Sequence, residues 1–165
     1  MKKNKKGFTL IELLAVIVVL GVIMSIAGTA VLKQKKKANI KEAKSLENTI
    51  TKIGEDLYTH ESMVGKTDDG YFYNKYKSLN SGDSIDISLT KLANAGYIKS
   101  NSIANPSGNG TCKGYLSVKK TDEGPSFKGY ICCPNLYTTD NEITDCSGFN
   151  EPSDVNSRNV KLTEQ

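Results

Sequence analysis

The chain has 165 residues, of which 38% are hydrophobic and 24% are charged, and its formal net charge is +4 at pH 7. This length allows one domain of ordinary size. Four lysines in the first six residues account for the net charge, because 22 basic residues less these four leave 18 against 18 acidic ones. Because the rest of the chain has no formal net charge, the net charge of the protein gives no reason to expect nucleic-acid binding.

The N-terminus divides into a short basic leader, residues 1–7, and an apolar segment, residues 8–32. The apolar segment contains one charged residue, Glu12. As a helix it would be about 37 Å long, which is enough to cross a bilayer with some tilt. A cleaved signal peptide is the alternative, since residues 25–27 and 28–30 offer small-x-small cleavage sites. The length of the apolar run and the glutamate inside it favour a membrane-spanning helix over a signal peptide.

Glu12 is the informative residue of this segment, because a carboxylate costs about 2.5–3.5 kcal/mol at the centre of a membrane helix. Such a residue needs a partner. The run Lys5-Lys6-Gly7-Phe8-Thr9-Leu10-Ile11-Glu12-Leu13 resembles the N-terminal motif of type IV prepilins and pseudopilins. In that family a membrane-embedded peptidase cuts after the glycine, and the new terminal residue is methylated on its amine. The resemblance therefore implies cleavage between Gly7 and Phe8, N-methylation of Phe8, and an assembly role for Glu12 against the terminal amine of a neighbouring subunit.

The resemblance also implies partners and a location. The partners are other pilins in a helical filament, the prepilin peptidase, an assembly ATPase, a platform protein and the membrane; DNA is left open as a further partner. The chain would be stored as a single-pass membrane protein and would become extracellular on assembly. A pilus subunit is the first hypothesis, and a pseudopilin of a DNA-uptake or type II secretion machine is the second. A monomeric anchored or secreted binding domain is the third.

One feature departs from the family pattern. Many members carry a proline near the position of Thr29, and this chain has none there. Gly21 and Gly28 predict either weak points in the helix or close packing through a stripe of small residues.

The helix is predicted to continue through residues 33–58. Its apolar positions are spaced 3, 4, 3 and 4 residues apart and form one helix face, namely Ala43, Leu46, Ile50, Ile53 and Leu57. The glutamates of this segment are expected on the exposed side, namely Glu42, Glu47 and Glu55. The lysine run at 33–37 is interpreted as a membrane-boundary anchor; binding of lipid headgroups, cell-wall polyanions or DNA is the alternative.

Residues 59–165 are predicted to form a disulfide-bonded globular domain with a polar tail that is mobile at its end. Residues 59–84 read as a loop region, in which the aromatic cluster of residues 71–76 is expected to pack over the helix. Residues 88–96 predict a short helix with Ser88 as N-cap and Gly96 as stop.

Residues 111–119 and 127–133 predict a β-hairpin in which Val118 pairs with Phe127. The predicted fold class is therefore α+β, with a long helix packed on a small antiparallel sheet. The sequence shows no catalytic constellation, and we predict no cofactor, no metal and no enzymatic activity.

All four cysteines lie in the C-terminal third, and their even number fits two disulfides in an oxidising compartment. Their spacing and the single histidine of the chain do not fit a zinc site. The hairpin register pairs Cys112 with Cys133 and leaves Cys132 for Cys146, in agreement with the C-terminal loop that family members often close. A one-residue slip of the strand would instead pair Cys112 with Cys132 and Cys133 with Cys146. Lysines flank the apolar segment on both sides, so the positive-inside rule does not determine its orientation in the membrane. The disulfides do, and they predict that the C-terminal domain lies outside the cell.

Overall fold

The computed structural model describes residues 9–99, 103–108, 110–139, 146–147, 149 and 160–164. The chain divides into two compact units, residues 1–38 and 39–165, which are described separately. Helix α1, Leu10–Val64, contributes residues to both units. The sequence placed the end of this helix near Tyr58, which is wrong, because the helix continues to Val64 and its last two turns carry buried residues of the second unit.

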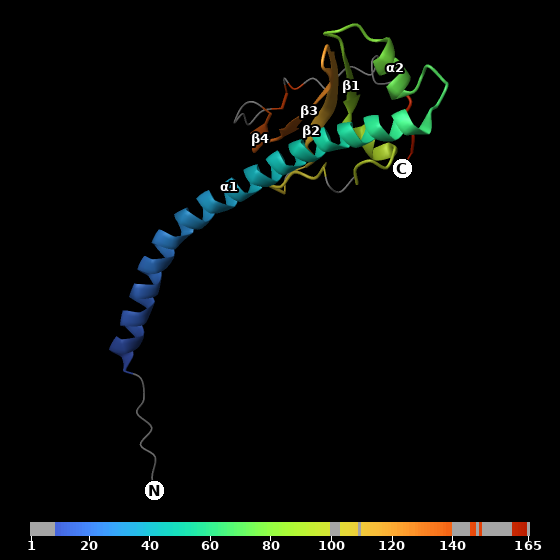
Figure 1. Cartoon of the computed structure of the whole chain (residues 1–165). Coiled ribbons are helices and arrows are strands. Elements are labelled where there is room, and N and C mark those ends of the chain that lie inside the picture. Colours follow the sequence, from blue (N-terminus) through green and yellow to red (C-terminus); the bar gives the residue numbers. More distant parts are fainter. Residues whose placement is uncertain are drawn as a thin grey trace. The chain divides into compact units, whose positions relative to one another are not determined.

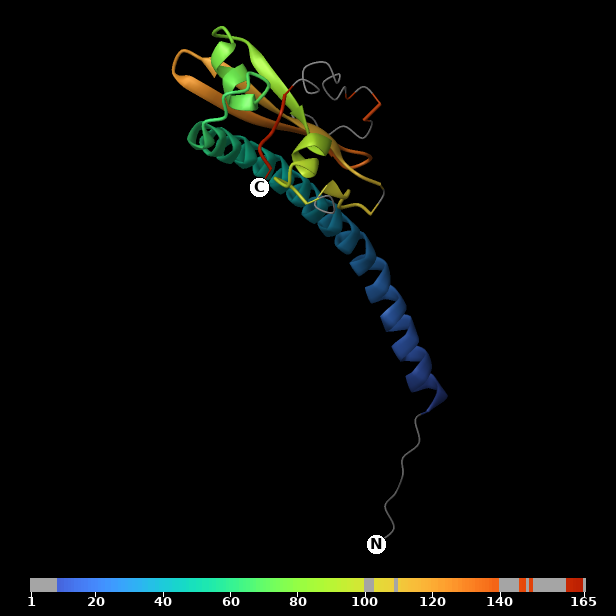
Figure 2. The ribbon, with the colours of Figure 1, turned by 90° about the vertical axis from the view of Figure 1, so that its right-hand side faces the viewer.

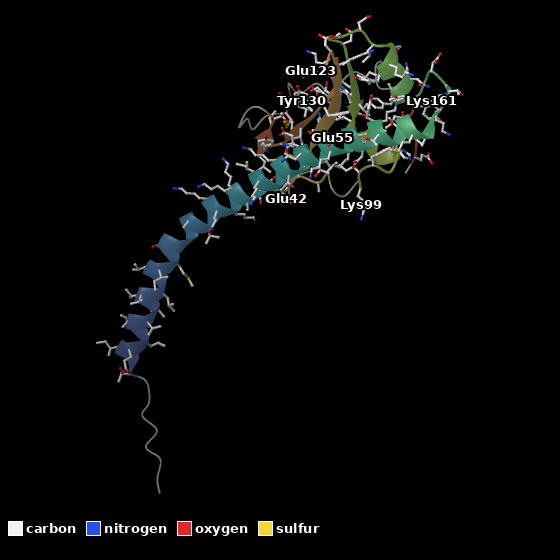
Figure 3. The ribbon with its side chains drawn as sticks, in the orientation of Figure 1. Glu42, Glu55, Lys99, Glu123, Tyr130 and Lys161 are labelled. Carbon is white, nitrogen blue, oxygen red and sulfur yellow. A yellow bond between two sulfur atoms is a disulfide. The ribbon has the colours of Figure 1, made fainter. Side chains whose placement is uncertain are left out.

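In the first unit, the apolar side chains of α1 that the structure describes between Leu10 and Leu32 are all exposed (Figure 3). The helix is long and apolar enough to cross a membrane, by length and composition. It has no break at Gly21 or Gly28. A Cβ added at either glycine would meet no atom within 4 Å. Neither glycine is therefore a packing site within the single chain.

The second unit contains a four-stranded antiparallel sheet in the order β1 (Ser84–Ser88), β2 (Lys113–Thr121), β3 (Gly124–Cys133), β4 (Tyr137–Thr138). Val118 pairs with Phe127, as the sequence predicted. The predicted α+β class, a long helix followed by a small antiparallel sheet, is confirmed. Strands β1 and β4 were not predicted, since β1 lies in a segment rich in glycine and aspartate and β4 has only two residues.

The sheet packs on the C-terminal part of α1 (Figures 1 and 2). The predicted apolar face supplies this contact, and Ile50, Ile53 and Leu57 are buried in the core together with Leu116 of β2. The backbones approach closely at Gly129, where an added Cβ would lie 2.5 Å from the carbonyl oxygen of Glu47. A glycine at this position lets β3 lie against the helix backbone.

Glu47 does not lie on the exposed side, so that expectation is wrong. Its Oε2 accepts hydrogen bonds from the Tyr137 hydroxyl at 2.8 Å and from Thr139 Oγ1 at 3.2 Å. This glutamate therefore links α1 to the end of the sheet. Glu42 and Glu55 are exposed, as expected.

Two short helices flank the sheet, α2 (Phe72–Ser78) and α3 (Leu89–Asn94). The predicted caps of α3 are confirmed: Ser88 Oγ accepts from the Lys91 amide, and Gly96 has the left-handed φ of 86° that follows a helix end. Helix α2 lies where a loop was expected. The aromatic cluster packs over α1 as predicted, with the Tyr73 and Tyr76 rings 5.3 and 5.2 Å from the Tyr58 ring.

Two disulfides join the strands and the loop after them. Cys112 is bonded to Cys133, and Cys132 is bonded to Cys146. This is the connectivity that the hairpin register places first.

The C-terminal residues 160–164 are docked on the domain, so the expected mobile tail end is wrong for this segment. Val160 is buried in the core, and Lys161 forms a parallel bridge with Tyr71. Glu61, whose exposed fraction is 2%, accepts from the amide of Thr163 at 2.9 Å. We call residues 160–164 the C-terminal strap.

Candidate assembly site at the helix N-terminus

The sequence places the candidate site at the junction of the leader and α1. Gly7 and Phe8 lie outside the described residues, and Thr9 is the first described residue. Glu12 lies in the first turn of α1 with its side chain exposed.

Thr9 and Glu12 hold each other in a reciprocal arrangement. The Thr9 amide and the Thr9 hydroxyl both donate to Glu12 Oε2 at 2.9 Å. In return, the Glu12 amide donates to Thr9 Oγ1 at 3.4 Å. This is a capping box, in which the residue before the helix and the third helical residue satisfy each other's amides. The Thr-x-x-Glu spacing that signals it is present in the sequence, and sequence reasoning missed it.

The capping box explains how the helix begins, but it does not neutralise Glu12. Its donors are an amide and a hydroxyl, which carry no charge. The sequence has no lysine or arginine from position 7 to position 32. The amide dipoles at a helix N-terminus favour a carboxylate there by about 0.3–1 kcal/mol when exposed, which is less than its cost at the centre of a bilayer. A carboxylate in this position can therefore gain from a cation that another chain supplies.

The remaining candidate residues lie in other parts of the chain. The lysine side chains at positions 33, 35, 36 and 37 are exposed along α1. Within the described ranges, no group of three histidine, cysteine, aspartate or glutamate side chains could hold a metal ion.

Comparison with known proteins gives one match. Residues 2–28 match the family model of the prokaryotic N-terminal methylation motif, which is the signature of type IV prepilins and pseudopilins. No curated protein and no solved structure matches the chain.

The motif indicates that the chain is a type IV pilin-like or pseudopilin protein. Proteins with this motif are in general processed by prepilin peptidase and assemble into pilin filaments. The motif points to a structural protein rather than an enzyme, and the apolar helix is compatible with membrane anchoring.

Proposed function

We propose that this protein is a structural subunit of a type IV pilus-like filament, assembled through its N-terminal helix. The observation that carries the proposal is the methylation motif at residues 2–28, which includes the start of α1 at Leu10 and the exposed apolar side chains that follow it. Cleavage between Gly7 and Phe8 removes the leader, residues 1–7, and methylation follows on Phe8.

Pairing between chains is the proposed role of Glu12. Cleavage exposes a cationic amine at Phe8, and within a staggered pack of helices this amine meets the Glu12 carboxylate of the next subunit. An unpaired charge in an apolar layer is costly, so the stagger that pairs both charges is favoured over staggers that do not. In the filament, Glu12 gives up its hydrogen bonds from the Thr9 amide and hydroxyl and pairs with the terminal amine of the neighbouring subunit. Because this pairing occurs at one stagger of the helices, Glu12 sets how neighbouring subunits are aligned along the filament.

The other parts of the chain follow from this role. Residues 8–32 anchor the stored subunit in the membrane, and α1 continues into the second unit, residues 39–165, where Ile50, Ile53 and Leu57 form part of the core. The two disulfides support an outside location for that unit, since disulfides persist in oxidising compartments. Head-to-tail contacts that do not close generate a helical filament. An assembly ATPase and a platform protein are the proposed cellular partners.

The test is to express the protein as the only pilin-like chain in a host that has the assembly machinery and the prepilin peptidase. Filaments are then released by shearing the cells and are analysed by mass spectrometry. We expect filaments built from a chain that begins at Phe8 and carries one extra methyl group. A mature chain that begins at Gly28 or Val31 would show signal-peptide cleavage and exclude a filament subunit. Correctly processed chains that form only short cell-bound assemblies would instead identify a pseudopilin.

A further inference from the structure

Residues 33–37 of α1, which we call the lysine collar, directly follow the apolar segment. The collar contains lysines at positions 33, 35, 36 and 37, and all four side chains are exposed. No acidic residue lies between Glu12 and Glu42. Glu12 is about 32 Å from Lys33 along the helix, well beyond the Debye length of about 8 Å at physiological salt. Glu42 is offset by its neighbour Lys41, so the collar keeps its positive charge.

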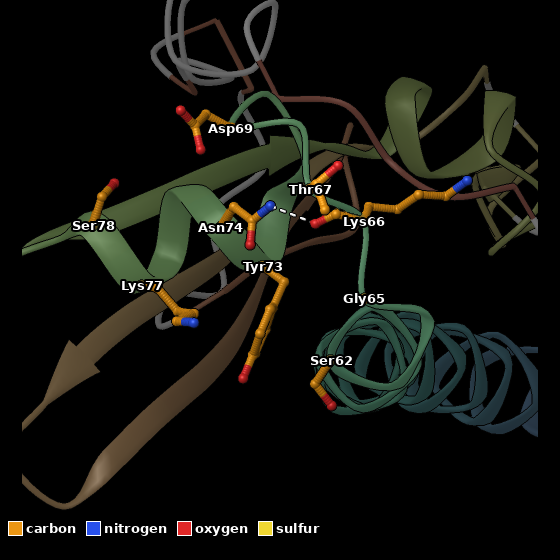
Figure 4. Close-up of a pocket in the computed structure, with 9 residues that line it drawn as sticks. All are labelled: Ser62, Gly65, Lys66, Thr67, Asp69, Tyr73, Asn74, Lys77 and Ser78. Carbon is orange, nitrogen blue, oxygen red and sulfur yellow. Dashed lines mark hydrogen bonds between the residues drawn. The ribbon is translucent and has the colours of Figure 1, made fainter.

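The collar differs from lysines of the second unit that the chain itself engages. Lys66 and Lys77 lie 5.7 and 5.6 Å from tyrosine ring centres and border an open polar hollow that also holds Asp69 (Figure 4). Lys161 pairs with Asp68. Within the described ranges, the four collar ammonium groups have no ion-pair, hydrogen-bond or aromatic partner. Their partner must therefore come from outside this part of the chain.

The position of the collar along α1 indicates what that partner is. A helix over residues 8–32 is about 37 Å long, which covers a hydrocarbon core of about 30 Å with some tilt. The headgroup region adds about 5–8 Å on each side of that core. The collar is about 7 Å long as a helix. With the apolar segment across the bilayer, the collar therefore lies among the lipid headgroups.

The directions of the collar lysines favour the same partner. At 3.6 residues per turn, Lys35 lies about 160° around the helix axis from both Lys33 and Lys37. A protein or a polymer docked on one face of the helix would reach only part of the collar. A layer of headgroups surrounds the helix and reaches every side of it.

We propose that the lysine collar binds the phosphate groups of anionic lipids. The proposal rests on the membrane-anchored stored form described under the proposed function. The lysine stems lie along the helix and place their ammonium groups among the headgroups, where anionic lipids gather in preference to zwitterionic ones. Because assembly draws the subunit out of the bilayer and breaks these contacts, anionic lipids favour the stored form over the filament.

The test measures which lipids surround the full chain in phosphatidylcholine vesicles. A trace of phosphatidylglycerol or phosphatidylcholine carries a spin label near the end of its acyl chain, and electron spin resonance gives the fraction of label that the protein immobilises. We expect phosphatidylglycerol to be enriched about fivefold at low salt, the factor that one lysine supplies at an anionic surface. The enrichment should fall at high salt because the charges are screened.

Two variants with equal changes in charge assign this enrichment. The collar variant carries Lys33→Gln, Lys35→Gln, Lys36→Gln and Lys37→Gln. It should lose about half of the enrichment, since the leader lysines remain at the other end of the apolar segment. The control should keep the enrichment, because it replaces four exposed lysines of the second unit, namely Lys52→Gln, Lys99→Gln, Lys113→Gln and Lys119→Gln.

Four results would overturn the proposal. Equal enrichment in the collar variant and the unchanged chain, both inserted in the vesicles, would exclude lipid binding by the collar and leave the filament proposal intact. Equal loss in the control would show a general effect of net charge. Displacement of the labelled phosphatidylglycerol by soluble polyphosphate would identify a site for polyanions. A chain that does not enter the vesicles would contradict the membrane-anchored form, and with it both proposals.

Discussion

Glu61 joins three separate segments, and its replacement is the sharpest test of how the second unit is held together. Oε2 accepts from the Tyr73 amide at the start of α2, and Oε1 accepts from the amide and the hydroxyl of Thr163 in the C-terminal strap. Glu61→Gln preserves the size of the side chain, but it replaces one of the two acceptor oxygens with an NH₂ group, which is a donor. The amide group of glutamine then faces a backbone N–H, and one buried donor loses its partner.

The magnitude follows from this change. A hydrogen bond to a charged group contributes about 1.5–3 kcal/mol, and a buried donor left without a partner costs about 1–3 kcal/mol. We expect the free energy of unfolding of the second unit to fall by about 2–4 kcal/mol. Glu55→Gln is the matched control, because Glu55 lies on the same helix with an exposed side chain (Figure 3), and its effect should stay within about 0.5 kcal/mol.

The assay is urea unfolding of the full chain in detergent, followed by the near-ultraviolet circular dichroism of its tyrosines. Limited proteolysis adds a local readout, and we expect the C-terminal strap to be cut faster in Glu61→Gln than in Glu55→Gln. An unfolding free energy of Glu61→Gln within about 1 kcal/mol of the unchanged protein would refute the role of Glu61 as a buried link.

Three further predictions follow from the second unit. Gly129→Ala should destabilise it by about 1–3 kcal/mol in the same urea assay, because the added Cβ would lie 2.5 Å from the Glu47 carbonyl oxygen, and an unchanged midpoint would contradict the close approach. Burial, and secondarily the Glu61 carboxylate, raises the pKa of Tyr97 from 10.0 to about 12. The stabilising contribution of protonated Tyr97 is therefore complete below about pH 10 and is lost as the pH rises through 12. NMR of labelled tyrosine can follow this titration, with Tyr97→Phe as the assignment control. Titration of Tyr97 near pH 10 would contradict the prediction. Peptide mapping without reduction, after a cut between the two adjacent cysteines, should give the linked pairs Cys112–Cys133 and Cys132–Cys146; the slipped pairing or four free thiols would contradict it.

The parts of the fold that local signals specify could be predicted from the sequence. The 3–4 spacing of apolar residues gave the helix, and Ser88 with Gly96 gave the limits of α3, because both signals act within a few residues. The hairpin register followed from the alternation of side chains between the two faces of each predicted strand, which places the apolar residues of both strands on one face.

The parts that depend on distant partners could not be predicted. Glu47 looked like an exposed glutamate, and its partner Tyr137 is 90 residues further along the chain. Glu61 and Thr163 are separated by 102 residues. No local pattern shows that Glu47 is half-buried and Glu61 buried, or that Glu61 holds the polar tail.

The candidate site divides in a similar way. The apolar surroundings of Glu12 and the glycine before Phe8 are visible in the sequence. The capping box with Thr9 is also visible there, as the Thr-x-x-Glu spacing of residues 9–12. The cationic partner of Glu12 belongs, in our proposal, to another chain, and no single sequence contains that contact.

The most direct test of the filament claim is the Glu12→Ala variant in a strain that carries no other copy of this protein. The control is Glu42→Ala, which changes an exposed glutamate of the same helix. Both the amount of protein in the membrane and the yield of sheared filaments are measured. We predict an unchanged or higher membrane level for Glu12→Ala, because removing a carboxylate eases insertion. Filament yield should fall about tenfold or more, the factor that a pairing free energy of about 1.4 kcal/mol supplies, whereas Glu42→Ala should leave it unchanged. Filament yield of Glu12→Ala equal to that of the unchanged protein would contradict assembly through this glutamate.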